Sequence, residues 1–91
     1  MNEIEESLQL YLIEQSAQLL DIEQSDVQWE DDIDEYGFDS MEVNRLCVQI
    51  NEHFDIFIQP VLFLELTSLE QLSEHLLEEF SEQIEQKLLG E

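Results

Sequence analysis

Apolar residues recur every three or four positions through the first twenty residues of the chain, and acidic or polar residues fill the gaps. This spacing places the apolar side chains along one face of a helix. Asn2, with Glu5 three residues later, matches a helix start cap and its reciprocal acidic partner. We therefore predict a first helix over residues 3–20. The residues at helical spacing are Ile4, Leu8, Tyr11, Leu12, Gln15 and Leu19.

Residues 21–39 break this period and are rich in Asp and Ser, which favour turns and caps over helix interiors. Large apolar residues are nevertheless spread through the segment, and an acidic linker would not need them. We predict a long loop that lies over the core and is pinned by these side chains. Loops of this length within compact domains are usually functional. The pinning residues are Ile22, Val27, Trp29, Ile33, Tyr36 and Phe38.

The helical period resumes over residues 40–54, which predicts a second helix there. Asp39 stands at the N-cap position, and Glu42 follows three residues later. This arrangement leaves Ser40 in the first turn, where its hydroxyl is not needed for capping and can face solvent. The amino end of a helix carries a partial positive charge and free N–H groups, so a phosphodiester on Ser40 would be favoured. The apolar stripe is formed by Val43, Leu46, Cys47, Ile50 and Phe54.

Two further helical segments are expected downstream. Residues 56–58 alternate like a strand but are too few to form one. Residues 60–65 begin with proline, a favoured first residue of a helix, and allow one or two turns. Thr67 or Ser68 can cap a last helix, whose apolar spacing continues towards Gly90. The prediction is an all-α fold, a small four-helix bundle with a long first loop and a short third helix.

The charge balance of the chain is extreme: 24 acidic residues stand against Arg45 and Lys87, a formal net charge of −22 over 91 residues. Nucleic-acid binding needs a basic surface that displaces counterions, and an anionic membrane would repel this chain. A protein with lysine and arginine patches would instead be steered towards it. We therefore expect protein partners, no nucleic acid and no membrane.

Cysteine and histidine offer little chemistry. Cys47 is the single cysteine and lies on an apolar stripe, so we expect a core residue, no internal disulfide and a reducing compartment. The first residues lack the features of a signal peptide, which favours a cytoplasmic location. His53 and His75 match no zinc spacing, and the acidic loop fits no calcium motif, so no metal site is predicted. A domain of this size has no room for an enclosed active site, so no catalytic residue is predicted.

Ser40 by itself is a common helix-start serine, but its surroundings are distinctive. Residues 36–41 read YGFDSM, residues 51–56 read NEHFDI and residues 60–65 read PVLFLE. These segments resemble the acyl carrier protein family, whose signature is a G-x-D-S core. They are most similar to acyl carrier domains of modular polyketide synthases, those of the trans-acyltransferase type. The resemblance extends over about residues 3–80.

The resemblance implies a function for the domain. A phosphopantetheinyl transferase would attach 4′-phosphopantetheine to Ser40, and the arm would carry acyl groups as thioesters. Asp39 would help to position the hydroxyl. The implied partners are the ketosynthase, acyltransferase and tailoring enzymes of a polyketide synthase, and the domain itself would be monomeric and without catalysis. We expect an acyl carrier domain in residues 1–80 and a C-terminal helix extension or linker in residues 81–91.

Five residues are expected to contact the partner enzymes. Met41 stands where the family has an exposed Leu or Ile, and methionine suits varied hydrophobic surfaces. Glu42 can pair with basic groups, and Val61 and Leu62 belong to a short apolar helix that can act as a movable lip. Arg45 stands where many fatty-acid carriers have an acidic residue, which argues against a fatty-acid synthase partner set.

Two alternatives remain open. The chain can be an acidic helical adaptor without the prosthetic group, in which Ser40 is an ordinary helix-start residue. It can also be a fatty-acid or peptidyl carrier, although peptidyl carriers more often read G-G-H/D-S, and Phe38 before Asp39 favours the acyl type. Carriers that serve β-branching often have Trp where this chain has Leu46, so that role is not inferred.

Overall fold

The computed structural model describes residues 3–35 and 37–90, and these residues form an all-α bundle, as predicted. Within that part of the chain the one extended pairing is an isolated bridge between Asp32 and Ser68. The predicted start cap at Asn2 and the predicted pin at Tyr36 lie outside the described residues. The elements are α1 (Glu3–Leu20), η1 (Gln24–Asp26), η2 (Ile33–Glu35), α2 (Ser40–Phe54), η3 (Pro60–Leu64), α3 (Leu69–Glu79) and α4 (Ser81–Leu89), where η marks a 3-10 helix.

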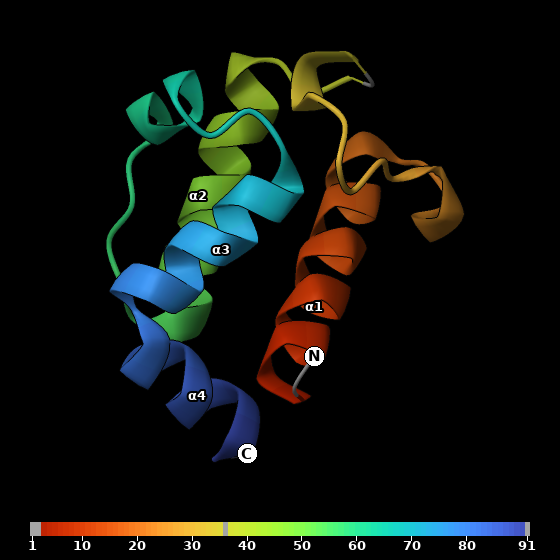
Figure 1. The fold of residues 1–91 in the computed structure, drawn as a ribbon. Coiled ribbons are helices and arrows are strands. Elements are labelled where there is room, and N and C mark those ends of the chain that lie inside the picture. The colour runs from red at the N-terminus through yellow and green to blue at the C-terminus, as the bar shows by residue number, and fades with distance from the viewer. Residues whose placement is uncertain (1–2, 36, 91) are drawn as a thin grey trace.

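Both long helices have the predicted bounds. In Figure 1, α1 stands on one side of the bundle, α3 lies across α2 on the other side, and α4 lies below them. The packing follows from the apolar stripes, because α1 meets each of the other three α-helices and buries its stripe among them. The fully buried apolar side chains are Leu8, Leu12, Leu46, Ile50, Leu69, Leu72, Leu76 and Ile84.

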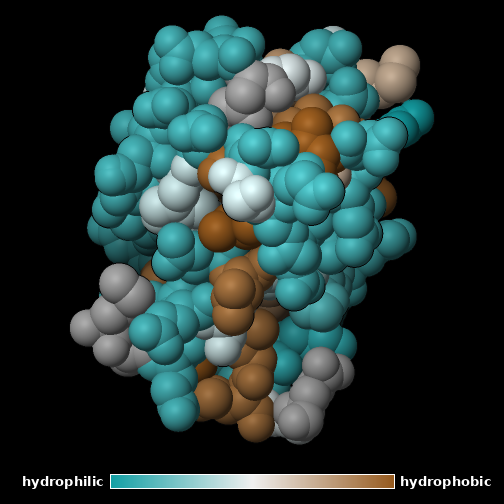
Figure 2. Space-filling model, turned by 90° about the vertical axis from the view of Figure 1, so that its right-hand side faces the viewer, coloured by the Kyte–Doolittle hydropathy of each residue, from teal (hydrophilic) through white to brown (hydrophobic). Residues whose placement is uncertain are grey.

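The outer surface is largely polar. Figure 2 shows the side of the molecule on which α1 lies in Figure 1; hydrophilic atoms cover most of it, and a narrower band of apolar atoms runs down to its lower end. Leu10 of α1 is one of the exposed large apolar residues, with 58% of its surface accessible. Among the described residues, no helix combines the length and apolar character needed to cross a membrane.

The long first loop lies on the core through its apolar side chains, as predicted. Val27, Ile33 and Phe38 are buried, and Ile22 and Trp29 pack against the core at partial exposure. Backbone hydrogen bonds fix the loop to the start of α3: the Ile33 amide donates to the Thr67 carbonyl at 2.9 Å, and the Glu70 amide donates to the Trp29 carbonyl at 3.0 Å. The loop is therefore a structured cover that ends at the start of α2.

The apolar spacing that continues towards Gly90 is divided between two helices. Ser68 caps α3 by accepting a hydrogen bond from the Gln71 amide, but the helix ends at Phe80, whose φ of −130° and ψ of 32° are not helical. The chain bends there and continues as α4, which packs against α1, α2 and α3. Beyond the bend, Ile84 of α4 is fully buried in the core.

Candidate functional site

The start of α2 is fixed by Gly37 and Asp39. Gly37 has a φ of 117°, a region that side chains rarely allow, and it turns the chain out of the first loop. Asp39 is extended, and its Oδ1 accepts hydrogen bonds from the amides of Met41 at 3.0 Å and Glu42 at 3.2 Å. Asp39 is therefore the N-cap of α2, as predicted.

Asp39 and Glu42 influence each other's protonation. The hydrogen bond from the Glu42 amide, followed by that from the Glu42 side chain, holds the pKa of Asp39 below its usual value. The same hydrogen bond between the side chains is the main cause that raises the pKa of Glu42. Asp39 consequently keeps a negative charge beside the amino end of α2, where the helix dipole favours an anion.

Ser40 is the first residue of α2, and its side chain is exposed. Because the Asp39 carboxylate accepts the amide hydrogen bonds at this helix end, the Ser40 hydroxyl is not required as the cap. The first turn of α2 thus presents a primary hydroxyl to solvent at the positive end of a 15-residue helix.

A hollow of about 240 Å³ opens beside Ser40. Apolar side chains from the first loop, α2 and η3 line it, together with three aspartates, Ser40 and Thr67. The volume matches an apolar fragment of a small molecule better than a whole substrate, so the hollow can shelter part of a group attached to Ser40. It is lined by Asp32, Ile33, Asp34, Phe38, Asp39, Ser40, Val43, Phe63 and Thr67.

The residues predicted to dock partners do not form one continuous site. Met41 is exposed to 57% of its surface and Glu42 is half-buried, and both follow Ser40 on α2. Arg45 lines a separate hollow between α1 and α2. Val61, exposed to 60%, and Leu62 do not line the Ser40 hollow and line a separate groove instead.

Phe63 of η3 reaches the Ser40 hollow, and the sequence did not single it out. The only available signal was its place in the apolar run of residues 61–64, directly after Pro60.

Cys47 behaves as predicted: it is buried, and burial raises the pKa of its thiol to about 11, which leaves the thiol unreactive near neutral pH.

Asn51 fixes the path of the backbone from α2 into η3. Its Nδ2 donates to the Ile58 carbonyl at 3.0 Å, and its Oδ1 accepts from the Ile58 amide at 2.8 Å. The Asn51 carbonyl also accepts from the Ile56 amide, beyond the left-handed C-cap at Asp55. One side chain in the last turn of α2 therefore sets the path of the chain into η3.

Two comparisons with known proteins bear on this geometry. The profile of the family described as phosphopantetheine attachment site matches residues 11–76, a span that includes Ser40 and every residue of the hollow beside it. The fold is similar to the NMR structure of the HMG-ACPI domain from the CurA module of Lyngbya majuscula, with a TM-score of 0.79 at 20% sequence identity. That similarity covers 91% of this chain and 85% of the other, and it supports the carrier-type helical fold expected from the sequence.

Proposed function

This chain belongs to the phosphopantetheine attachment site family, and we propose that it is an acyl carrier domain whose 4′-phosphopantetheine arm is attached to Ser40. Members of the family carry substrates for partner enzymes and are not themselves catalysts, and 4′-phosphopantetheine is their prosthetic group. The observation that carries the proposal is the exposed Ser40 hydroxyl in the first turn of α2, beside an N-cap supplied by Asp39.

The residues around Ser40 fit the chemistry of the group. A phosphodiester at Ser40 would lie next to the amino end of α2, where amide groups and the helix dipole favour negative charge. The adjoining hollow offers apolar side chains from Ile33, Val43 and Phe63 to the hydrocarbon part of the arm. When bound, the arm supplies a terminal thiol that holds acyl groups as thioesters.

The roles of Ser40 and Asp39 follow from their positions. Ser40 Oγ is the nucleophile: it would bond to the phosphorus that carries the pantetheine arm of coenzyme A, the pyrophosphate P–O bond would break, and adenosine 3′,5′-bisphosphate would leave. Asp39 is a poor base for its proton, because its pKa is lowered and its Oδ1 already accepts two amide hydrogen bonds. Asp39 is therefore a positioning residue that sets the start of α2, and the transferase supplies the base.

We propose a polyketide-type acyl group as the cargo. The segments at residues 51–56 and 60–65 support this, and the fold similarity to a CurA carrier domain is in keeping with it. The partners would be the ketosynthase, acyltransferase and tailoring enzymes of a cytoplasmic polyketide synthase. Met41, exposed beside Ser40, and the acidic surface suit enzymes that present an apolar spot among lysine and arginine.

The test is the mass of the intact chain after incubation with coenzyme A, Mg²⁺ and a phosphopantetheinyl transferase of broad specificity. The chain and a Ser25→Ala control, which removes another exposed serine, should each gain one phosphopantetheine moiety. Ser40→Ala should gain none while it keeps the helical circular dichroism of the parent. The absence of any gain in the parent, or a gain that persists in Ser40→Ala, would refute the proposal and favour an adaptor without the prosthetic group.

A further inference from the structure

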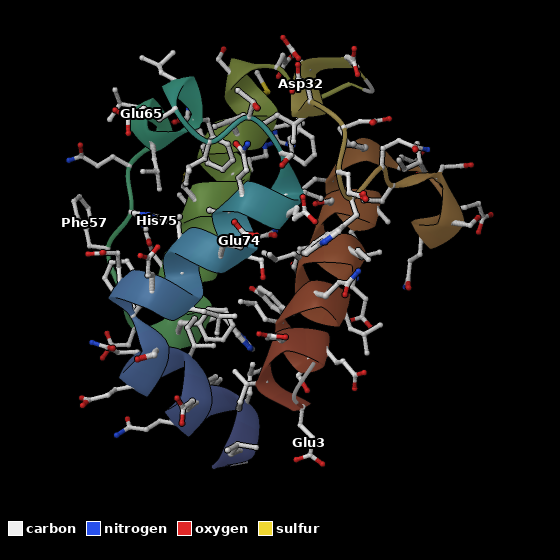
Figure 3. The ribbon with its side chains drawn as sticks, viewed as in Figure 1. Glu3, Asp32, Phe57, Glu65, Glu74 and His75 are labelled. Carbon is white, nitrogen blue, oxygen red and sulfur yellow. The ribbon has the colours of Figure 1, made fainter. Side chains whose placement is uncertain are left out.

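The connection between α2 and η3 holds an aromatic side chain outside the core. Ile58 is buried, with 5% of its surface exposed, and Ile56 is partly buried, whereas Phe57 between them exposes 69%. The two hydrogen bonds between the Asn51 side chain and the Ile58 backbone fix this extended segment, so its alternation turns Phe57 outward. Figure 3 shows Phe57 projecting from the edge of the molecule, on the side where His75 lies on α3.

Phe57 borders a groove of about 280 Å³. The groove lies between the α2–η3 connection, η3 and the end of α3, and most of its lining is apolar. Pro60 and the Asn51 hydrogen bonds hold its walls, so a ligand would meet a groove that is already formed. The lining residues are Phe57, Ile58, Gln59, Val61, Leu62, His75 and Phe80.

The charged residues that stand next to the lining of the groove in the sequence are acidic. Asp55 precedes the extended segment, and Glu78 and Glu79 of α3 directly precede Phe80; all three are exposed. The cationic side chains of the chain lie elsewhere, since Arg45 lines the hollow between α1 and α2 and Lys87 lines a hollow with Tyr11 and His53. An apolar groove with acidic neighbours is complementary to an apolar side chain flanked by basic ones.

This groove is separate from the Ser40 hollow. The two share no lining residue: Phe63 of η3 lines the hollow, whereas Val61 and Leu62 of η3 line the groove. A protein in the groove would therefore leave Ser40 accessible. The net charge of −22 disfavours a second copy of this chain as the occupant.

We propose that the groove bordered by Phe57, Val61 and Phe80 is a docking site for a partner protein that presents an apolar side chain flanked by lysine or arginine, on an amphipathic helix. The site goes beyond the proposed function, because it needs neither Ser40 nor the prosthetic group. A partner held there remains bound while other enzymes reach Ser40.

The probe for this site is a synthetic amphipathic helical peptide of leucine and lysine, added to the isotope-labelled chain and followed by amide NMR. A peptide of the same charge with serine in place of leucine is the matched probe. The leucine peptide should shift the amides of residues 57–62, His75 and Phe80 most, and the serine peptide should not. Phe57→Ser should raise the Kd by about tenfold or more, as expected for a central aromatic contact. Leu10→Ser, which removes an exposed apolar residue on α1, should leave it unchanged.

Ser40→Ala should bind the leucine peptide as tightly as the parent, so this result stands apart from the test of the arm. Three outcomes of the peptide titration would overturn the proposal. The shifts can spread evenly over the acidic surface, they can centre on Met41, or Phe57→Ser and Leu10→Ser can weaken binding equally. Concentration-dependent broadening at the groove amides without peptide would assign the groove to self-association instead, which also overturns it. A thermal unfolding curve of Phe57→Ser should match the parent, because the side chain is exposed.

Discussion

Asn51→Ala removes the side chain that joins the last turn of α2 to Ile58. Two hydrogen bonds are lost, from Nδ2 to the Ile58 carbonyl at 3.0 Å and from the Ile58 amide to Oδ1 at 2.8 Å. Each contributes about 1 kcal/mol net, and the Ile58 groups that remain lose their partner beside the core. We expect the clamp as a whole to stabilise the fold by about 2 kcal/mol.

Alanine also raises helix propensity, which offsets part of this loss by up to about 0.7 kcal/mol. Asn44→Ala is the matched control, because Asn44 is exposed on the same helix and receives the same gain. The difference in unfolding free energy between the two variants therefore isolates the clamp. For a domain of this size, a difference of about 2 kcal/mol in unfolding free energy corresponds to a difference in Tm of roughly 8–16 °C.

Urea unfolding followed by circular dichroism measures the difference. Unfolding free energies of Asn51→Ala and Asn44→Ala that agree within about 0.5 kcal/mol would refute the argument that Asn51 fixes the path into η3. The same result would remove the reason to expect Phe57 to be held outward, so this experiment also bears on the proposed groove.

Three further predictions follow from the core and from the start of α2. Ile84→Ala should lower the unfolding free energy by about 3 kcal/mol, because Ile84 is fully buried. Leu89→Ala in the same helix should change it by less than about 0.5 kcal/mol, because Leu89 is 61% exposed. Equal effects of the two substitutions would mean that α4 is not part of the core. Ser16→Ala should raise the unfolding free energy by about 0.5–1 kcal/mol. The buried Ser16 hydroxyl has no hydrogen-bond partner among the described residues, and alanine is the better helix former. A loss of stability would show that the hydroxyl is hydrogen-bonded. In a carboxyl NMR titration Asp39 should titrate below its usual 3.8 and Glu42 above its usual 4.5, and the reverse order would contradict the hydrogen bonding at this helix start. Because the folded pKa of Asp39 is lowered, its contribution to stability is present above pH 3.8 and is lost as the pH falls through the folded pKa; that of Glu42, whose pKa is raised, is present below pH 4.5 and is lost as the pH rises through its folded pKa.

Local signals in the sequence were sufficient for the parts of the fold that depend on neighbouring residues. The bounds of α1 and α2 follow from apolar spacing, and the N-cap at Asp39 follows from its residue type and place. The buried side chains of the first loop were also predictable, because Val27 and Ile33 are costly to expose in so acidic a segment.

The bend at Phe80 had no local signal. Apolar residues continue at intervals of four through residues 76, 80, 84 and 88, so the spacing is the same with or without a break. The bend is set by packing, since α4 contacts α1 and α2, which are distant in sequence. Packing between distant residues of this kind is outside what a periodic pattern can indicate.

The groove bordered by Phe57 is lined by Ile58, which Asn51 holds from seven residues away. The alternation at residues 56–58 is too short to predict a strand, and no strand forms in the described residues. Its consequence is instead that Phe57 faces outward. The sequence indicated Val61 and Leu62 as partner contacts, but it could not show that Phe63 is the η3 residue that lines the hollow beside Ser40.

The most direct test of the central claim is to locate the arm within the loaded chain. Fragmentation of the loaded protein by tandem mass spectrometry should place the whole added mass between Gly37 and Met41, a stretch in which Ser40 is the only hydroxyl-bearing residue. The account predicts one phosphopantetheine moiety there and none on any other peptide. An added mass on a peptide that carries Ser25 or Ser81, with residues 37–41 unmodified, would contradict it.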